Sequence, residues 1–326
     1  MSEETFVGFW PTREEVGEFG LVTLNSCGLP DTDTQARCAS TLFNFSGPGW
    51  KIRVCADYLV LVHIEDLEPS LTAARNQPDT NFDFSIGATR AAWPRYVEAL
   101  NALYFLLFAS CSTGRNHSIL HDFSELSFWH CARVLYRDDG KPIRHSNYGR
   151  TSGSYLRRFG ERTCSADSPS LELGHETFKD MAFYWNIIQE IDLVPLAATA
   201  AKVISDHRLS NYRASIVLTW FEVENWIIET ADGLGIQTTY VAKKTGDIRT
   251  HYITDILKNL PEGTTVKVNF SDIDALRVIR NKIAHKNYRP VLQDSALAIR
   301  CLMYVIKMRS GLNLKVDEGP PPTIGL

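Results

Sequence analysis

The sequence predicts an α+β protein in which a mixed N-terminal domain with short strands precedes an all-helical C-terminal domain. In the first half of the chain, short alternating or apolar runs are separated by Gly, Pro and Asp, a pattern typical of strands. After residue 173, apolar residues recur at helical spacing over long segments. The length of 326 residues also suits two domains.

In the N-terminal part, the patterns predict strands at 41–45, within 50–64, at 81–86 and at 126–136, and a long helix at 94–110. Residues 138–172 are rich in Gly, Ser, Asp and Arg and have little periodicity, which indicates a linker or a long loop. This break places the domains at 1–170 and 171–326. Arginines alternate with Tyr and Phe in the same segment, so an alternative is that it binds single-stranded nucleic acid.

In the C-terminal part, we expect helices at 176–191, 195–207, 209–232, 252–260, 271–288 and 292–310. Ser210 or Asn211 is a candidate N-cap of the third helix, and Ser271 of the fifth, because their side chains can accept hydrogen bonds from free backbone N–H groups. Gly311 is expected to end the last helix. A turn-rich insert at 235–250 separates two of these helices.

Composition narrows the class of protein. The acidic N-terminus has no apolar run behind it, and no segment is long and apolar enough to span a bilayer, so we expect a cytoplasmic protein without a membrane partner. The seven cysteines and the histidines at 117, 121, 130 and 145 fit no zinc spacing, and no nucleotide-binding motif is present. No metal or cofactor is therefore expected.

Charge is distributed unevenly along the chain. Residues 1–190 contain 17 Lys and Arg against 24 Asp and Glu, whereas residues 191–326 contain 17 against 14. Within 277–309, eight cationic residues accompany a single acid, Asp294. A local basic surface of this kind favours a partner that carries phosphate, although a solvated helix face has the same composition.

The basic segment contains the stretch RNKIAHKNYRP, residues 280–290. Arg280 offers a permanent charge and a fork of donors for phosphate oxygens, and Asn281 offers an amide that can orient a neighbour. His285 stands near the predicted end of a helix, where the helix dipole favours a protonated imidazole suited to general acid–base catalysis. Arg280 and His285 are five residues apart, which separates them by about 140° around a helix. Convergence therefore requires a loosened helix end or a second copy of the chain.

The element Arg280-Asn281-x-x-x-His285 within a helical domain resembles the signature of the HEPN superfamily. The earlier segment 213–227, RASIVLTWFEVENWI, resembles the long helix of Apea-like HEPN proteins and places Glu224 where a supporting acid is expected. The resemblance covers about residues 175–310. It implies a dimeric helical bundle and a metal-independent endoribonuclease with one composite site at the dimer interface, as in toxins and antiviral defence effectors held inactive by an antitoxin or an absent signal.

Under this resemblance, His285 is the acid or base, Arg280 the phosphate-binding cation and Asn281 an orienting side chain. Three further cations are candidates for RNA contact: Lys282, Lys286 and Arg289. Of the two acids on the earlier helix, Glu224 either supports the site or faces solvent, and exposure is favoured for Glu222. Two alternatives to the nuclease remain: a catalytically inactive module that binds RNA or a partner protein, and an assembly factor without RNA affinity. The first 170 residues would then act as a sensor or targeting module.

Overall fold

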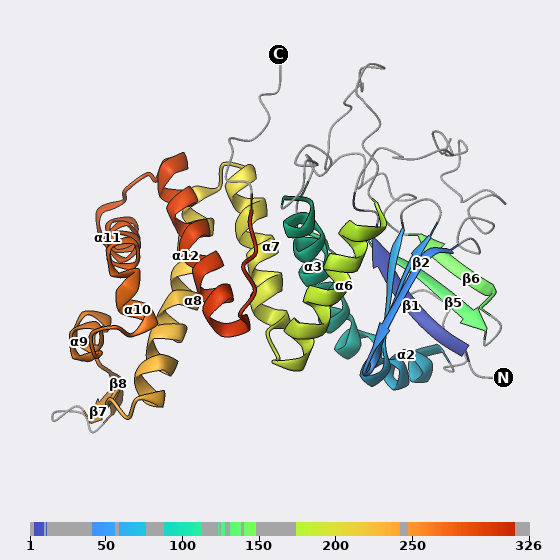
Figure 1. Cartoon of the computed structure of the whole chain (residues 1–326), viewed down its shortest axis with the longest axis horizontal. Coiled ribbons are helices and arrows are strands. Elements are labelled where there is room, and N and C mark those ends of the chain that lie inside the picture. The colour runs from blue at the N-terminus through green and yellow to red at the C-terminus, as the bar shows by residue number, and fades with distance from the viewer. Residues whose placement is uncertain are drawn as a thin grey trace, which may run out of the picture. The chain divides into compact units, whose positions relative to one another are not determined.

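The computed structural model describes residues 3–9, 11, 41–55, 59–75, 88–112, 123, 125–127, 131–137, 140–147, 174–241 and 247–316. The chain forms two compact units, residues 1–198 and 199–326. An antiparallel sheet belongs to the first unit and helices dominate the second, so the predicted α+β class is confirmed (Figure 1).

The first unit contains a sheet with the strand order β2-β3-β4-β1-β5-β6. Its strands are β1 (Glu3–Phe9), β2 (Thr41–Gly47), β3 (Trp50–Cys55), β4 (Val60–Ile64), β5 (Ala132–Arg137) and β6 (Pro142–Asn147). All neighbouring strands pair antiparallel. The predicted run at 50–64 is divided between β3 and β4, and the segment expected at 81–86 lies outside the described residues.

Strand β1 occupies the centre of the sheet although the sequence pattern did not predict it. Its buried part, residues 5–9, lies between β4 and β5. Because a central strand is buried on both faces, it lacks the alternation that marks a half-exposed strand. The acidic residues Glu3 and Glu4 begin the strand, and they make the segment resemble a polar terminus.

Four helical segments complete the described part of the first unit: η1 (Glu65–Leu67), α2 (Glu68–Arg75), α3 (Ala88–Ser112) and α6 (His175–Glu190). Helix α3 is almost completely buried from residue 99 to residue 111. Its Tyr104 ring packs on Phe9 of β1, with ring centroids 5.0 Å apart. Helix α6 packs against α3 and β2 (Figure 1). The division between the units falls at 198/199, later than the boundary at 170/171 that the sequence predicts.

The second unit is built from helices and one small hairpin. Helix α7 (Val194–Arg208) leads into α8 (Tyr212–Gly233), the hairpin β7 (Thr239–Val241) and β8 (Ile248–Thr250), and then α9 (Ile253–Asn259), α10 (Thr265–Val268), α11 (Phe270–Lys286) and α12 (Leu292–Ser310). Helix α8 contacts α9, α11 and α12. In the described parts of the chain, no helix combines the length and apolar character needed to cross a membrane.

The helix ends test the predicted caps. Gly311 ends α12 in the left-handed conformation, with φ of 75°, as its position in the sequence predicts. Ser271 lies inside α11, which begins at Phe270, so its prediction as the N-cap is wrong. Asn211 does stand at the N-cap position of α8, but its side chain donates to Asp206 Oδ1 (2.9 Å) instead of capping the helix. Neither helix therefore begins with a side-chain cap.

A buried hydrogen-bonded chain joins α7, α8 and α12. Ser295 Oγ donates to Ser215 Oγ at 2.9 Å, and His207 Nδ1 lies 2.9 Å from Ser295 Oγ. All three residues are at most 1% exposed. Buried polar groups are costly unless they are paired, so this chain favours one register of the three helices over alternatives that would separate its members.

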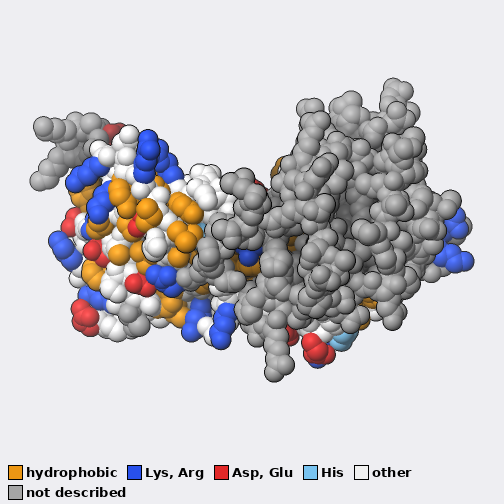
Figure 2. Space-filling view, turned by 90° about the horizontal axis from the view of Figure 1, so that it is seen from above, with side chains coloured by type: hydrophobic (Ala, Val, Ile, Leu, Met, Phe, Trp, Pro, Cys, Tyr) orange, Lys and Arg blue, Asp and Glu red, His pale blue; other side chains and the backbone are white. Residues whose placement is uncertain are grey.

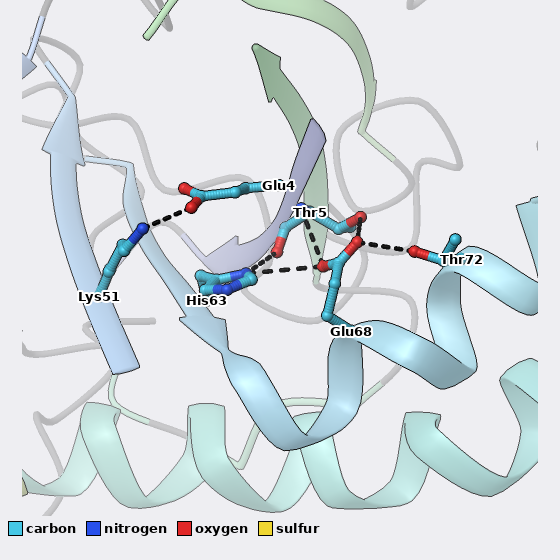
Figure 3. Close-up of polar contacts among 6 residues, drawn as sticks. All are labelled: Glu4, Thr5, Lys51, His63, Glu68 and Thr72. Atoms are coloured by element: carbon cyan, nitrogen blue, oxygen red, sulfur yellow. Dashed lines mark hydrogen bonds and ion pairs between the residues drawn. The ribbon is translucent and has the colours of Figure 1, made fainter. Parts of the chain in front are cut away.

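A second cluster of polar contacts, around Glu68, lies where the chain leaves β4 (Figure 3). The Glu68 carboxylate accepts hydrogen bonds from the Thr5 backbone N–H (3.0 Å), the Thr5 hydroxyl (3.1 Å) and the Thr72 hydroxyl (3.0 Å). His63 Nδ1 donates to the Thr5 carbonyl oxygen at 3.0 Å, and nearby Lys51 pairs with Glu4. Glu68 thus satisfies a backbone donor of β1 that lies beyond its pairing with β4.

We predict that Glu68→Ala lowers the free energy of unfolding by about 1–3 kcal/mol, because the buried Thr5 N–H loses its acceptor. Urea denaturation followed by tryptophan fluorescence measures the loss. Glu65→Ala is the matched control, since Glu65 is exposed one turn earlier and its removal should change stability by less than about 0.5 kcal/mol. Equal losses in the two variants would show that the Glu68 contacts do not stabilise the sheet.

Candidate nucleic-acid interface

The predicted motif occupies the last two turns of α11. The buried side of this helix is formed by Ile273, Leu276 and Ile283. At about 100° per residue, Asn281 lies about 40° from His285 on the opposite, outer side. His285 is exposed and Asn281 is half-exposed, so both side chains can reach a ligand from solvent.

Arg280 leaves the helix about 140° from His285, as the spacing predicts, but its side chain turns back toward the outer side. Its Nη1 donates to Asn281 Oδ1 at 3.1 Å. The guanidinium is therefore held beside the amide that shares the outer side with His285. Because the guanidinium has five donors, the others remain for an anion. Arg280 and Asn281 are thus in contact with each other, and His285 lies about one turn beyond Asn281 at the same helix end.

The end of α11 is fixed by contacts from the chain beyond it and from α8. Asn287 adopts the left-handed conformation, with φ of 49°, and its backbone N–H donates to the Lys282 carbonyl. The Tyr288 N–H donates to the same carbonyl at 3.3 Å. Arg213 of α8 reaches this turn from outside, and its Nη2 lies 3.4 Å from both Asn287 Oδ1 and the Tyr288 carbonyl oxygen. These contacts hold the turn that follows His285.

Among the described residues, the cations at this end make no ion pair with a carboxylate. They are Arg280, Lys282, Lys286 and Arg289. By contrast, Arg277 is paired with Asp274 at 2.7 Å and Arg309 with Glu229 at 3.0 Å. Unpaired cations leave a positive potential that an external anion can neutralise. On the face of the helical unit shown in Figure 2, lysine and arginine side chains surround a group of hydrophobic side chains.

The one acid within the basic segment is occupied by local contacts. Asp294 Oδ2 accepts from the Tyr288 hydroxyl (2.9 Å) and from the Val291 N–H (2.9 Å). The hydrogen bond to Asp294 raises the pKa of the Tyr288 hydroxyl, with a smaller contribution from burial. Lys282 Nζ lies 5.7 Å from the centroid of the Tyr288 ring. Asp294 therefore holds the connection between α11 and α12 and makes no ion pair with the four cations.

Of the two acids of α8, Glu222 differs from the sequence prediction. Glu222, for which exposure was favoured, is half-buried and accepts a hydrogen bond from Thr199 of α7 at 3.3 Å. Burial raises the pKa of the Glu222 carboxyl, while the Thr199 hydrogen bond and the nearby Arg309 oppose this shift. Glu224 is half-exposed and has no hydrogen bond or ion pair with any described residue. Within one copy of the chain, neither acid contacts Arg280, Asn281 or His285.

Sequence reasoning missed Arg213 and Tyr288 as parts of this end of the helix. Both lie in segments that the sequence had marked, Arg213 at the start of the tryptophan-containing helix and Tyr288 within the motif stretch. Arg213 contacts residues that lie 74 and 75 positions later in the chain, whereas Tyr288 contacts Asp294, six positions later. The contact between Tyr288 and Asp294 can be predicted from the sequence, because the two residues are close in the chain and Asp294 is the one acid of the basic segment. The contact from α8 requires the packing of the helices.

Other candidate features fall largely outside the described residues. The histidines at 117, 121 and 130 lie there, and so does the basic and aromatic segment except for residues 140–147. Within the residues that the structure describes, no group of three or more His, Cys, Asp or Glu side chains is arranged to hold a metal ion.

Comparison with known proteins gives no further assignment. No family model matches the chain, no curated protein matches it, and no solved structure matches it. The geometry of α11 and its surroundings therefore carries the functional argument.

We predict that Glu222→Gln raises the thermal unfolding midpoint at neutral pH. A glutamate whose pKa is raised in the folded state contributes stability when protonated, and this contribution is lost as pH rises through the folded pKa. Glutamine keeps an acceptor for Thr199 without a desolvated charge. The midpoints of variant and wild type should converge below the ordinary glutamate pKa of about 4.3.

Thermal scans across this pH range measure the difference. Glu229→Gln is the control, because it removes the ion-pair partner of Arg309 and should give no gain in midpoint. A Glu222→Gln variant that is less stable than wild type at neutral pH would mean that attraction to Arg309 outweighs burial at this carboxyl.

Proposed function

We propose that the helical unit is a metal-independent endoribonuclease of HEPN type that acts as a dimer. One observation carries the proposal: the exposed His285 shares a helix end with the Arg280–Asn281 pair and with cations that have no acidic partner among the described residues. A general acid–base group, an oriented guanidinium and a positive surface are the parts needed to bind and cleave a phosphodiester. The resemblance of this element to the HEPN signature supports the same assignment.

In the proposed reaction, the 2′-oxygen of RNA attacks the adjacent phosphorus and displaces the 5′-oxygen of the next nucleotide. The 2′-hydroxyl proton is removed by a base, and a proton is delivered to the departing oxygen. The products are a 2′,3′-cyclic phosphate and a 5′-hydroxyl, so neither water nor metal is consumed. His285 transfers protons, and Arg280, oriented by Asn281, binds the charged phosphate oxygens.

The composite site of the proposal needs two copies of the chain. One copy supplies a single His285 at this helix end, whereas the reaction needs both a base and an acid. A second copy facing the first would supply the other imidazole. The first unit would then serve as a sensor or targeting module, and an antitoxin or activating signal would control the pair, as the resemblance implies.

The cleavage assay uses purified full-length protein with transfer and messenger RNA in EDTA. We expect wild type to release fragments with 2′,3′-cyclic phosphate ends. Arg280→Ala and His285→Ala should each reduce the cleavage rate by about 10²–10⁴-fold, because each removes a group that acts in the transition state. His175→Ala, a histidine of the first unit, is the matched control and should retain the wild-type rate. Undiminished cleavage by His285→Ala, or cleavage that requires a metal ion, would refute the proposal.

A second candidate function, RNA binding without cleavage, is favoured by the unpaired cations alone. Whether or not cleavage occurs, we predict that Lys286→Ala lowers the slope of log affinity against log salt by about 1 unit. Arg277→Ala is the control, since Arg277 is paired with Asp274 and should change the slope much less. A titration of fluorescent single-stranded RNA at several salt concentrations measures both slopes. An affinity independent of salt would exclude phosphate contacts and favour an assembly factor.

A further inference from the structure

One side of α8 carries exposed apolar side chains between two opposite charges. Val217 is 45% exposed and Phe221 is 63% exposed, and together they form an apolar patch on the outer side of the helix. Arg213, Val217, Phe221 and Glu224 lie within about 80° around the helix axis, and Ile228 continues the same side. Leu209, 70% exposed, precedes the helix on the N-terminal side of Arg213. We call these six residues the α8 stripe.

The α8 stripe is complementary to itself when it is reversed. If two copies of α8 lie antiparallel around a two-fold axis beside residues 218 and 219, Arg213 of each copy faces Glu224 of the other. Val217 of each then faces Phe221 of the other. Such a self-complementary patch is what a two-fold interface requires. A parallel arrangement would instead bring Arg213 against Arg213 and Glu224 against Glu224, which charge repulsion disfavours.

We propose that the α8 stripe binds the α8 stripe of a second copy of this chain, in antiparallel orientation. The apolar centre is removed from water on both copies, and Arg213 and Glu224 form two equivalent ion pairs at its ends. Glu224 has no hydrogen bond or ion pair with the described residues of its own copy, so its carboxylate is available to the second copy. Within the described part of its own copy, Arg213 donates hydrogen bonds through Nη2 only, which leaves its other donors for that carboxylate.

The pairing also brings the second copy to the candidate site. Arg213 holds Asn287 Oδ1 and the Tyr288 carbonyl oxygen, two and three residues beyond His285. Glu224 of the second copy would fix the same guanidinium from the other side. Arg213 and Glu224 are then positioning residues that couple association of the copies to the geometry of the α11 end. This second step rests on the proposed function, whereas the pairing of the stripes does not.

Charge reversal across the interface tests the pairing. Arg213→Glu and Glu224→Arg each place like charges opposite one another twice in a homodimer, so each variant should dissociate at least about tenfold more readily than wild type. In a 1:1 mixture of the two variants, a mixed dimer again has two ion pairs, one with reversed polarity and one with the wild-type polarity. The mixture should therefore form dimers at concentrations where each variant alone is monomeric. Sedimentation velocity on full-length protein measures the masses, with one variant carrying a fluorophore.

Lys307→Glu is the control, because it reverses an exposed charge of α12 outside the α8 stripe and should leave the dimer intact. Circular dichroism checks that each variant is folded. Dimer formation in the mixture is a second check, since unfolded chains would not form dimers when they are mixed. A monomeric wild type at about 50 µM, or a mixture that remains monomeric while both variants are folded, would overturn the pairing.

The same samples separate the pairing from the proposed function. In each mixed dimer one copy keeps Arg213 opposite Glu224 of the other, so a dimeric mixture should recover part of the RNA cleavage that the single variants lose. A dimeric mixture that cleaves RNA at the full wild-type rate, although half of its copies lack Arg213, would overturn the coupling of Arg213 to the site and leave the interface standing. A dimeric wild type that never cleaves RNA would overturn the nuclease proposal alone.

Discussion

The buried hydrogen bonds among His207, Ser295 and Ser215 are the constraint on which the helical unit depends. Apolar packing alone tolerates small shifts of one helix along another, because one aliphatic contact substitutes for the next. A fully buried hydroxyl does not, since any shift that separates it from its partner leaves a polar group without a hydrogen bond. The three residues come from α7, α8 and α12, so one short chain of contacts fixes the register of three helices.

The consequence of this register appears at the end of α11. Arg213 precedes Ser215 by two residues on α8, and Asp294 precedes Ser295 by one on α12. These outward neighbours of the buried serines hold the connection that follows the motif: Arg213 binds Asn287 and Tyr288, and Asp294 binds Tyr288 and the Val291 N–H. The buried contacts between the helices thus determine where the candidate site lies. Its residues are exposed, but the turn that orients them is tied to α8 and α12.

The positive charge at the end of α11 follows from the same arrangement of the helices. With Asp294 committed to the connection between α11 and α12, and Asp274 paired with Arg277, the described acids near the motif are occupied. Arg280 is oriented by an amide, which fixes its direction without neutralising its charge. An oriented but uncompensated cation is suited to an anionic ligand, whereas an ion-paired one is not. This distinction separates the four cations at the helix end from the rest of the basic segment.

The sequence by itself determined the α+β class, the places of the long helices, the end of α12 at Gly311 and the contiguous motif from Arg280 to His285, because periodicity, a left-handed cap and short spacing are local properties. It did not determine β1, whose burial on both faces removes the alternating signal, or the start of α11, which lies at Phe270 and not after a Ser271 cap. Only the tertiary structure decided that Glu222 is buried against α7, that Glu224 is left without a partner among the described residues of its own copy, and that Arg213 reaches the motif. Each of these depends on which helices meet and in what register, and that information is distributed over residues far apart in the chain.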